Sequence, residues 1–377
     1  GMRERLARVA LNRLSEPGDV RLTRLVEQLG ATRVYQLLRE EQDIEGVYTD
    51  VAARLQGLDP ERDLERAAAL GIRFVCPEDA EWPDQLADLD RAEPLHERGG
   101  TPLGLWVKGS HRLDEVCRDA AAVVGSRSAT TYGAGVASDI AAHLGERDVT
   151  VVSGAAFGID QAAHRGALAV KGLTVAVLAC GVDRAYPSAH RNLLDYIAET
   201  GLVVSELPPG CAPTRVRFLS RNRVIAALAR GTVVVEAAVR SGALNTANWT
   251  TRLNRVLMGV PGPVTSAPSE GVHELIRSRG ATLVTRGEDV LELLAPSGSF
   301  LCEVPRAPAL VTDGLTNRDQ QILDAVPVSQ PAPEGSIARA AGVGVRSLPD
   351  AMERLRRLGL VEKSSRGWRR APRAVSR

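Results

Sequence analysis

The sequence predicts an α/β fold: a doubly wound, mostly parallel sheet with a small helical domain before it and a winged helix after it. Three observations predict this fold. Apolar residues near the start of the chain recur at helical spacing. From about residue 120, short Val-rich runs alternate with segments of helical length, which is typical of a parallel sheet covered on both faces. A Pro-, Ala- and Ser-rich stretch then separates the last part of the chain.

The first part of the chain predicts short amphipathic helices. Leu6, Ala10 and Leu14 share one helix face, because residues three to four apart lie above one another on a helix. Two further segments with the same spacing follow, on either side of Gly30, which is a typical helix end. We therefore expect a small helical domain over residues 2–58.

Residues 59–294 predict a Rossmann-like domain that contains the sheet. The largely apolar runs expected to form its strands are Ile72–Val75, Ala121–Val124, Val149–Val152, Leu173–Ala179, Leu202–Val204, Thr232–Val235, Val256–Val260 and Thr282–Val284, and a further segment, Leu103–Val107, lies between the first two. Segments of helical length separate the later runs, among them Tyr132–Leu144, Asp160–Val170 and Ala189–Ala198. Because these runs do not alternate between apolar and polar residues, both faces of the sheet should be buried.

The end of the chain predicts a linker and a third domain. The stretch 295–314 has the composition of a linker. Residues 315–377 then contain two short helical segments, a turn through Gly342–Gly344, and an amphipathic helix from Leu348 to Leu358. Two short runs around a final turn complete the order of a winged helix-turn-helix.

The composition limits the classes of function. The net charge is +1, so any basic site must be local. No run of about 18 apolar residues occurs, so we expect a cytoplasmic protein without a membrane span. The five cysteines are far apart and lack CxxC or CxxH spacing, which argues against a zinc site and a disulfide framework. We expect neither a metal nor a cofactor.

Five loops at the carboxyl ends of the predicted strands form the candidate site, because open parallel sheets bind ligands at that edge. They combine glycines, hydroxyls and backbone amides, and they are Gly125–Arg127, Ser153–Asp160, Cys180–Pro187, Pro213–Arg230 and Glu236–Ala247. Asp160 is the predicted N-cap of a helix, and the N-terminus of that helix would attract a phosphate. Asp160 and His164 are four residues apart, but no third ligand joins them, so we expect a structural histidine.

The loop from Pro213 to Arg230 is the most informative of the five. It contains five arginines and no acidic residue, and Phe218 lies among the arginines. This combination is typical of single-strand binding, because guanidinium groups bind phosphates and an aromatic ring stacks on a base. A solvated helix face is the alternative interpretation. It is disfavoured because Asn222–Ala229 is mostly apolar and should be buried on one side.

Together the motifs resemble those of the DprA (DNA processing protein A, also called Smf) family. They follow one another in the same order as in that family, and the resemblance spans nearly the whole chain. The segments that carry the resemblance are Val-Val-Gly-Ser-Arg at 123–127, Val-Val-Ser-Gly to Ala-Ala-His-Arg-Gly-Ala-Leu at 151–168, Cys-Gly-Val-Asp-Arg-Ala-Tyr-Pro at 180–187, Ser-Glu-Leu-Pro-Pro-Gly at 205–210, Phe-x-x-Arg-Asn-Arg at 218–223, Val-Val-Val-Glu-Ala at 233–237, Ser-Gly-Ala-Leu-x-Thr-Ala at 241–247 and Val-Pro-Gly at 260–262.

The resemblance implies a non-enzymatic homodimer that binds and protects single-stranded DNA and loads RecA onto it in natural transformation and recombination. It also implies a SAM-like class for the helical domain. The DNA-contacting residues implied by the matching motifs are Arg127, Ser153, Gly154, Phe218, Arg221, Asn222, Arg223, Ser241 and Thr246. Phe157 stands where the family often has arginine, and Ser220 where it has a basic residue. Either two phosphate contacts are absent here, or Phe157 stacks on a base.

Two other functions are alternatives to this one. A nucleotide phosphoribohydrolase of the related lysine decarboxylase-like group would carry a PGGxGTxxE signature, whereas Arg230–Glu236 keeps only a Gly-Thr pair and a later glutamate. A sequence-specific regulator would use the winged helix, but Asp350 and Glu353 lie on the face that would enter the major groove. We therefore expect a protein-contact or accessory role for that domain.

Overall fold

The computed structural model describes residues 1–295 and 309–372. The chain forms two compact units, Gly1–Cys302 and Glu303–Arg377. Of the linker predicted at 295–314, residues 296–308 lie outside the described residues. Its last part, Val311–Gly314, forms a short 3-10 helix, η3.

The first unit begins with helices that pack around an apolar cluster. They are α1 (Met2–Leu14), α2 (Val20–Leu29), α3 (Ala31–Arg39), α4 (Val47–Leu55) and α5 (Pro60–Ala69). Asp19 caps α2, because its carboxylate accepts hydrogen bonds from the backbone of Arg21 and Leu22. Gly30, with φ of +81°, ends that helix in a backbone conformation that only glycine adopts easily. The sequence prediction of short helices in this region is confirmed.

A nine-stranded sheet forms the centre of the first unit, in the order β1-β2-β6-β5-β4-β3-β7-β8-β9. The strands are β1 (Ile72–Val75), β2 (Leu105–Lys108), β3 (Ala120–Val124), β4 (Thr150–Ser153), β5 (Thr174–Leu178), β6 (Leu202–Ser205), β7 (Gly231–Val234), β8 (Val256–Gly259) and β9 (Thr282–Leu283). The pairs β1–β2 and β2–β6 are antiparallel and the other pairs are parallel. The predicted doubly wound, mostly parallel sheet is confirmed.

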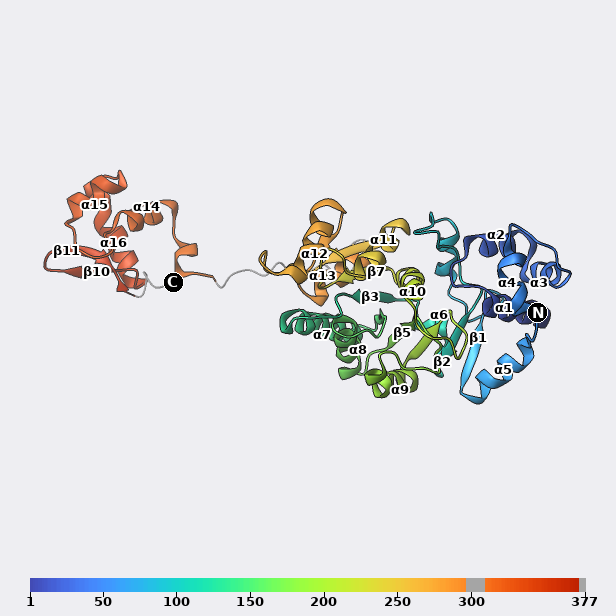
Figure 1. Cartoon of the computed structure of the whole chain (residues 1–377). Helices are drawn as coiled ribbons and strands as arrows, with labels where there is room; N and C mark the ends of the chain where they lie inside the picture. The colour runs from blue at the N-terminus through green and yellow to red at the C-terminus, as the bar shows by residue number, and fades with distance from the viewer. Residues whose placement is uncertain (296–308, 373–377) are drawn as a thin grey trace. The chain divides into compact units, whose positions relative to one another are not determined.

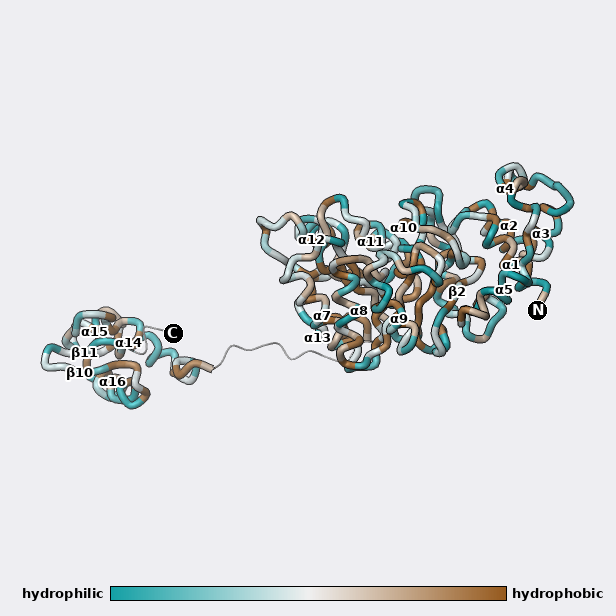
Figure 2. The backbone as a smooth tube through the Cα atoms, turned by 60° about the horizontal axis from the view of Figure 1, so that its bottom comes forward, coloured by the Kyte–Doolittle hydropathy of each residue, from teal (hydrophilic) through white to brown (hydrophobic). Residues whose placement is uncertain are grey.

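Helices cover both faces of this sheet (Figure 1). They are α6 (Leu113–Val116), α7 (Thr131–Glu146), α8 (Ile159–Ala169), α9 (Arg191–Thr200), α10 (Arg215–Leu228), α11 (Ala243–Arg252), α12 (Ala267–Ser278) and α13 (Gly287–Leu294), with 3-10 helices η1 (Asp84–Asp90) and η2 (Ser188–His190). Hydrophobic residues concentrate on the strands and on the helix faces that meet them (Figure 2). No helix within 1–295 or 309–372 is long and apolar enough to cross a membrane.

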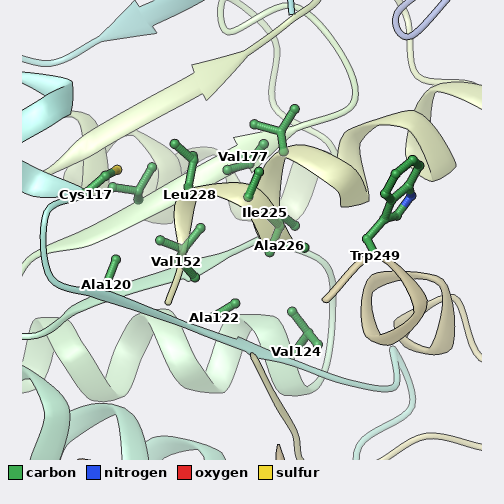
Figure 3. Close-up of a cluster of buried hydrophobic side chains, with 14 of the residues drawn as sticks. Cys117, Ala120, Ala122, Val124, Val152, Val177, Ile225, Ala226, Leu228 and Trp249 are labelled. Atoms are coloured by element: carbon green, nitrogen blue, oxygen red, sulfur yellow. The ribbon is translucent and has the colours of Figure 1, made fainter. Parts of the chain in front are cut away.

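One buried cluster joins β3 to α10, the helix that carries the predicted arginine run. Figure 3 shows Ala120, Ala122 and Val124 of β3 together with Ile225 and Leu228 of α10. All of these side chains are buried. Burial of this apolar face, at roughly 25 cal/mol per Å², fixes α10 against the sheet. The other face of α10 is thereby held at the carboxyl ends of the strands.

The helical segment 2–58 lies in the same compact unit as the sheet. Asn12 of α1 links them, because its Nδ2 donates to the Glu206 carbonyl and its Oδ1 accepts from Trp106 Nε1. Both bonds are buried. The boundary at residue 58 and the SAM-like class stay predictions.

The second unit contains three main helices followed by a hairpin. Its elements after η3 are α14 (Asn317–Ala325), α15 (Glu334–Ala341), η4 (Val345–Ser347), α16 (Leu348–Arg357), β10 (Val361–Ser364) and β11 (Gly367–Arg370). Met352, Leu355 and Trp368 are buried in its core. The helices and the hairpin follow in the order that the sequence predicted. The winged-helix class and the domain limits 315–377 stay predictions.

Candidate functional site

A groove of about 1620 Å³ lies at the carboxyl ends of the central strands. It begins at Val124 and Gly125, where β3 ends, and β3 separates β4 on one side from β7 on the other. This is the point where the strand order reverses, and open α/β sheets bind ligands there. The loop after β7, the N-terminal half of α10 and the start of α11 form its other walls. We call it the strand-end groove.

Gly125 allows the first wall to come close to its neighbours. A Cβ at this position would lie 2.6 Å from Ile159 and 2.7 Å from the Glu236 carbonyl. The following amide, of Ser126, donates to that carbonyl at 2.7 Å. The turn is therefore fixed by backbone contacts, and it places Arg127 on the exposed rim.

Phe218 lies close to two arginines in the strand-end groove. The guanidinium of Arg127 lies 4.7 Å from the centre of the Phe218 ring, and that of Arg221 lies 5.5 Å from it. The centre of the Tyr186 ring lies 5.6 Å from the centre of the Phe218 ring. Arg127 makes no hydrogen bond to the described residues, so the ring is the contact that positions it.

Arg221 is nearly buried at the floor of the groove, with 8% of its surface exposed. Its Nη1 donates to the carbonyls of Gly154 and Val177, and its Nε donates to Asn222 Oδ1. Burial lowers the pKa of Arg221 to about 10, and the nearby Asp160 carboxylate opposes this shift. Arg221 therefore remains charged at neutral pH, so the groove has a fixed positive charge at its floor.

Amide side chains continue the network from Arg221 to α11. Arginine can only donate, so Asn222 must direct its Oδ1 toward Arg221. Asn222 Nδ2 then donates to Asn245 Oδ1 at 3.2 Å. Ser241 and Thr246 also line the groove, although only 2% of Thr246 is exposed.

Three residues predicted to contact DNA lie in the interior instead. Both terminal nitrogens of Arg223 bind the Glu206 carboxylate, at 2.5 and 2.6 Å, and the residue is fully buried, so Arg223 does not face the groove. Ser153 is also fully buried, and its hydroxyl donates to the Val123 carbonyl. Gly154 does not line the groove, but a Cβ there would lie 2.7 Å from Arg221 Nη1, so this glycine makes room for the guanidinium.

Acidic residues distant in the sequence neutralise part of the predicted arginine run. Arg217 pairs with Glu16 at 2.8 Å, and Arg230 pairs with Asp119 at 2.6 Å. With Arg223 held by Glu206, only Arg215 and Arg221 of the five arginines line the groove. Three arginines outside this run also line the groove and add to its positive charge: Arg127, Arg240 and Arg279.

Asp160 and His164 have structural roles. The N-cap position of α8 is Gly158, so the prediction of Asp160 as N-cap is wrong. The Asp160 carboxylate accepts a hydrogen bond from the amide of Gly154, six residues earlier in the chain. His164 is fully buried and lies between Thr174 and the Ala155 amide. Burial, together with His190 and Arg221, lowers the pKa of His164 to about 3. The described ranges contain no group of three or more residues arranged to hold a metal ion.

Glu236 is the glutamate that this chain shares with the phosphoribohydrolase signature, and it binds the N-cap residue of α7. Its Oε1 accepts from both the amide and the hydroxyl of Thr130, the N-cap of that helix. It is 1% exposed and does not line the groove. A carboxylate at a helix N-terminus is stabilised by the helix dipole.

Sequence reasoning did not identify Arg279 and Asn248 as site residues. Arg279 directly follows α12 and Asn248 lies on α11, and Arg279 donates to Asn248 Oδ1 at 2.7 Å at the edge of the groove. Neither belongs to a loop that follows a predicted strand directly, so no local pattern signalled them.

The exposed ring of Phe157 lies against His190, and the two ring centres are 4.8 Å apart. Its neighbour in the chain, Ala156, lines the groove.

Comparison with known proteins gives consistent matches. A family model for DNA recombination-mediator protein A matches residues 73–295. A putative DNA processing protein DprA of Mycobacterium tuberculosis is 44% identical over 95% of this chain and 92% of its own length. DNA processing protein DprA of Streptococcus pneumoniae is 38% identical over 67% of this chain and 88% of its own length.

Two solved structures are similar in fold. The X-ray structure of DprA from Streptococcus pneumoniae has a TM-score of 0.63 and 30% identity, and covers 77% of this chain and 96% of that chain. A DNA processing protein A from Helicobacter pylori, described for its single-stranded DNA binding mode, has a TM-score of 0.50 and 24% identity, with 59% and 95% coverage. The second likeness is evidence for the fold only.

Proposed function

Since the chain belongs to the DNA recombination-mediator protein A family of DNA processing proteins, we propose that it binds single-stranded DNA in the strand-end groove. We propose further that it acts as a cytoplasmic homodimer, protects the bound strand, and loads RecA onto it in natural transformation and recombination.

The contacts of the Phe218 ring with Arg127 and Arg221 are the observation that carries the proposal. An unpaired base has an exposed π-face on each side, whereas the bases of a duplex are already stacked. A half-buried aromatic ring with arginines at 4.7 and 5.5 Å therefore suits a strand whose base stacks while its phosphates approach the guanidinium groups.

The charges of the groove support an anionic ligand. Its walls contain Arg127, Arg215, Arg221, Arg240 and Arg279, against Asp160, Glu270 and Glu274. Glu236, the carboxylate that the hydrolase signature would supply, is held by the amide and the hydroxyl of Thr130 and does not line the groove. We therefore propose a binding protein rather than an enzyme.

Fluorescence anisotropy with a labelled oligothymidylate, and with a duplex of equal length, tests the proposal across salt concentrations. We expect tighter binding of the single strand and a log–log salt slope of about −0.7 per phosphate contact. Arg127→Ala should flatten that slope by about 0.7 and weaken binding about fivefold at roughly 0.1 M salt. Arg33→Ala, an exposed arginine of α3 outside the groove, is the control. The proposal is contradicted if the protein binds the duplex as tightly as the single strand, or if its affinity does not depend on the salt concentration.

The loading of RecA needs a separate measurement. RecA ATPase activity on single strands precoated with a single-strand-binding protein should rise when this protein is added. Arg127→Ala should reduce that gain in parallel with its loss of DNA affinity. Sedimentation velocity tests the homodimer. A monomer at micromolar concentration, or no gain in ATPase activity, would refute these parts of the proposal.

A further inference from the structure

A second depression, of about 720 Å³, adjoins the strand-end groove. The two share Asn248 and Arg279, so they are continuous at these residues. The C-terminal half of α11 and the segment that follows η1 form the rest of its walls, with Arg91, Glu93 and Arg252. In Figure 1 the teal segment after η1 lies beside α11. We call this region the α11 depression.

One face of α11 runs from the groove into the α11 depression. Leu244, Asn248 and Arg252 are four residues apart and therefore share that face. Leu244 lines the groove, Asn248 lines both regions, and Arg252 lines the depression. The distance from Asn245 to Arg252 is about 10 Å at 1.5 Å per residue, which is about three nucleotides at a stacked spacing of 3.4 Å.

The guanidinium of Arg252 is anchored by one nitrogen only. Its Nη1 donates to the carbonyls of Glu93 and Pro94, at 3.0 and 3.2 Å. Its remaining nitrogens make no hydrogen bond to the described residues, and one third of the side chain is exposed. An arginine held in this way presents donors at a fixed position, which suits a phosphate.

The net charge of the α11 depression is positive. Arg91, Arg252 and Arg279 face a single carboxylate, Glu93, whose side chain is 92% exposed and 4.0 Å from Arg252. An exposed pair at this distance contributes little, because water and salt screen it. Asn248 and Thr251 add neutral polar groups. The region lacks an exposed aromatic ring, so it can bind a backbone but has no platform for a base.

We propose that a single strand held in the strand-end groove continues along α11, and that Arg252 and Arg91 bind its phosphodiester backbone in the α11 depression. This inference rests on the proposed function. It extends the site by a segment that recognises phosphates without stacking bases.

The test compares two lengths of oligothymidylate, one of about six nucleotides and one of about twenty, by anisotropy. Arg252→Ala and Arg91→Ala should each weaken the longer strand about fivefold at roughly 0.1 M salt and flatten its salt slope by about 0.7. Binding of the short strand should not change. Arg127→Ala should weaken both lengths, and Arg33→Ala neither.

Arg252→Lys and Arg252→Gln separate charge from packing, because Arg252 also holds residues 93 and 94. Lysine should keep the salt slope of the longer strand, and glutamine should flatten it. Equal weakening of both lengths, or no weakening of the longer one, overturns the inference while the proposed function stands. If the unaltered protein binds neither length, the proposed function fails and the inference fails with it.

Discussion

Removal of the Phe218 ring is the sharpest test of the site. The ring is half-buried and contacts Tyr186 as well as the guanidinium groups of Arg127 and Arg221. Arg221 has three hydrogen bonds of its own, so it should stay in place in Phe218→Ala. Arg127 has none to the described residues, so it should lose its position.

Two contributions set the expected loss of affinity. Stacking of one base on an aromatic side chain contributes about 1–3 kcal/mol. The contact between Arg127 and the ring contributes about 0.5–1 kcal/mol at an exposed site. Phe218→Ala should therefore weaken single-strand binding by roughly 5- to 150-fold from stacking alone, and more if Arg127 is also released.

A double-mutant cycle with Arg127→Ala separates these contributions. Anisotropy is measured for both single variants and for the double variant at a temperature well below unfolding. If the ring positions Arg127, the two losses should overlap by about 0.5–1 kcal/mol instead of adding. Tyr196→Ala, which removes an exposed ring of α9 outside the groove, is the matched control.

Stability is measured on the same variants. A fully buried Phe→Ala change costs about 3–5 kcal/mol, so this half-buried ring should cost roughly 2 kcal/mol. That corresponds to a decrease in Tm of roughly 4–8 °C. The reasoning is refuted if Phe218→Ala binds DNA normally at low temperature with only a lower Tm, since Phe218 would then be purely structural. Strict additivity in the cycle would refute the positioning of Arg127.

Three further predictions follow from buried groups and from the two compact units. Arg223→Met should lower the free energy of unfolding by about 3–5 kcal/mol, because it leaves the Glu206 carboxylate buried without a partner. Adding Glu206→Leu should restore most of the Tm, and a double variant with no higher Tm than Arg223→Met would contradict this pairing. The pKa of His164 is depressed to about 3, so the folded protein keeps the ring neutral while the unfolded chain protonates it below about pH 6.5. Stability should then fall by up to about 1.4 kcal/mol per pH unit between about pH 6.5 and 3, and urea midpoints at pH 7 and 5 should differ less in His164→Gln than in the unaltered protein. A chain that ends after residue 314 should keep most of its single-strand affinity in anisotropy, because the groove lies in the first unit; loss of binding would place the site elsewhere.

The sequence determined the architecture of the sheet and the location of the site. The Val-rich runs that become β3, β4 and β7 are largely apolar and do not alternate with charged residues, and a sheet covered on both faces buries them along their whole length. Because parallel strands end at one edge, the loops that follow them had to meet there. Arg127 and Phe218 were therefore predicted to lie near each other although 91 positions separate them, and in the structure they are in contact.

Only the tertiary structure decided which arginines face the groove. Arg221 and Arg223 are two residues apart on α10, which places them about 200° apart around the helix. Arg221 faces the groove, whereas Arg223 faces Glu206 and the helical segment. The partners Glu16, Glu206 and Asp119 come from other parts of the chain. A local count of charges cannot include them, since ion pairing depends on distances in space, and those distances exist only once the chain has folded.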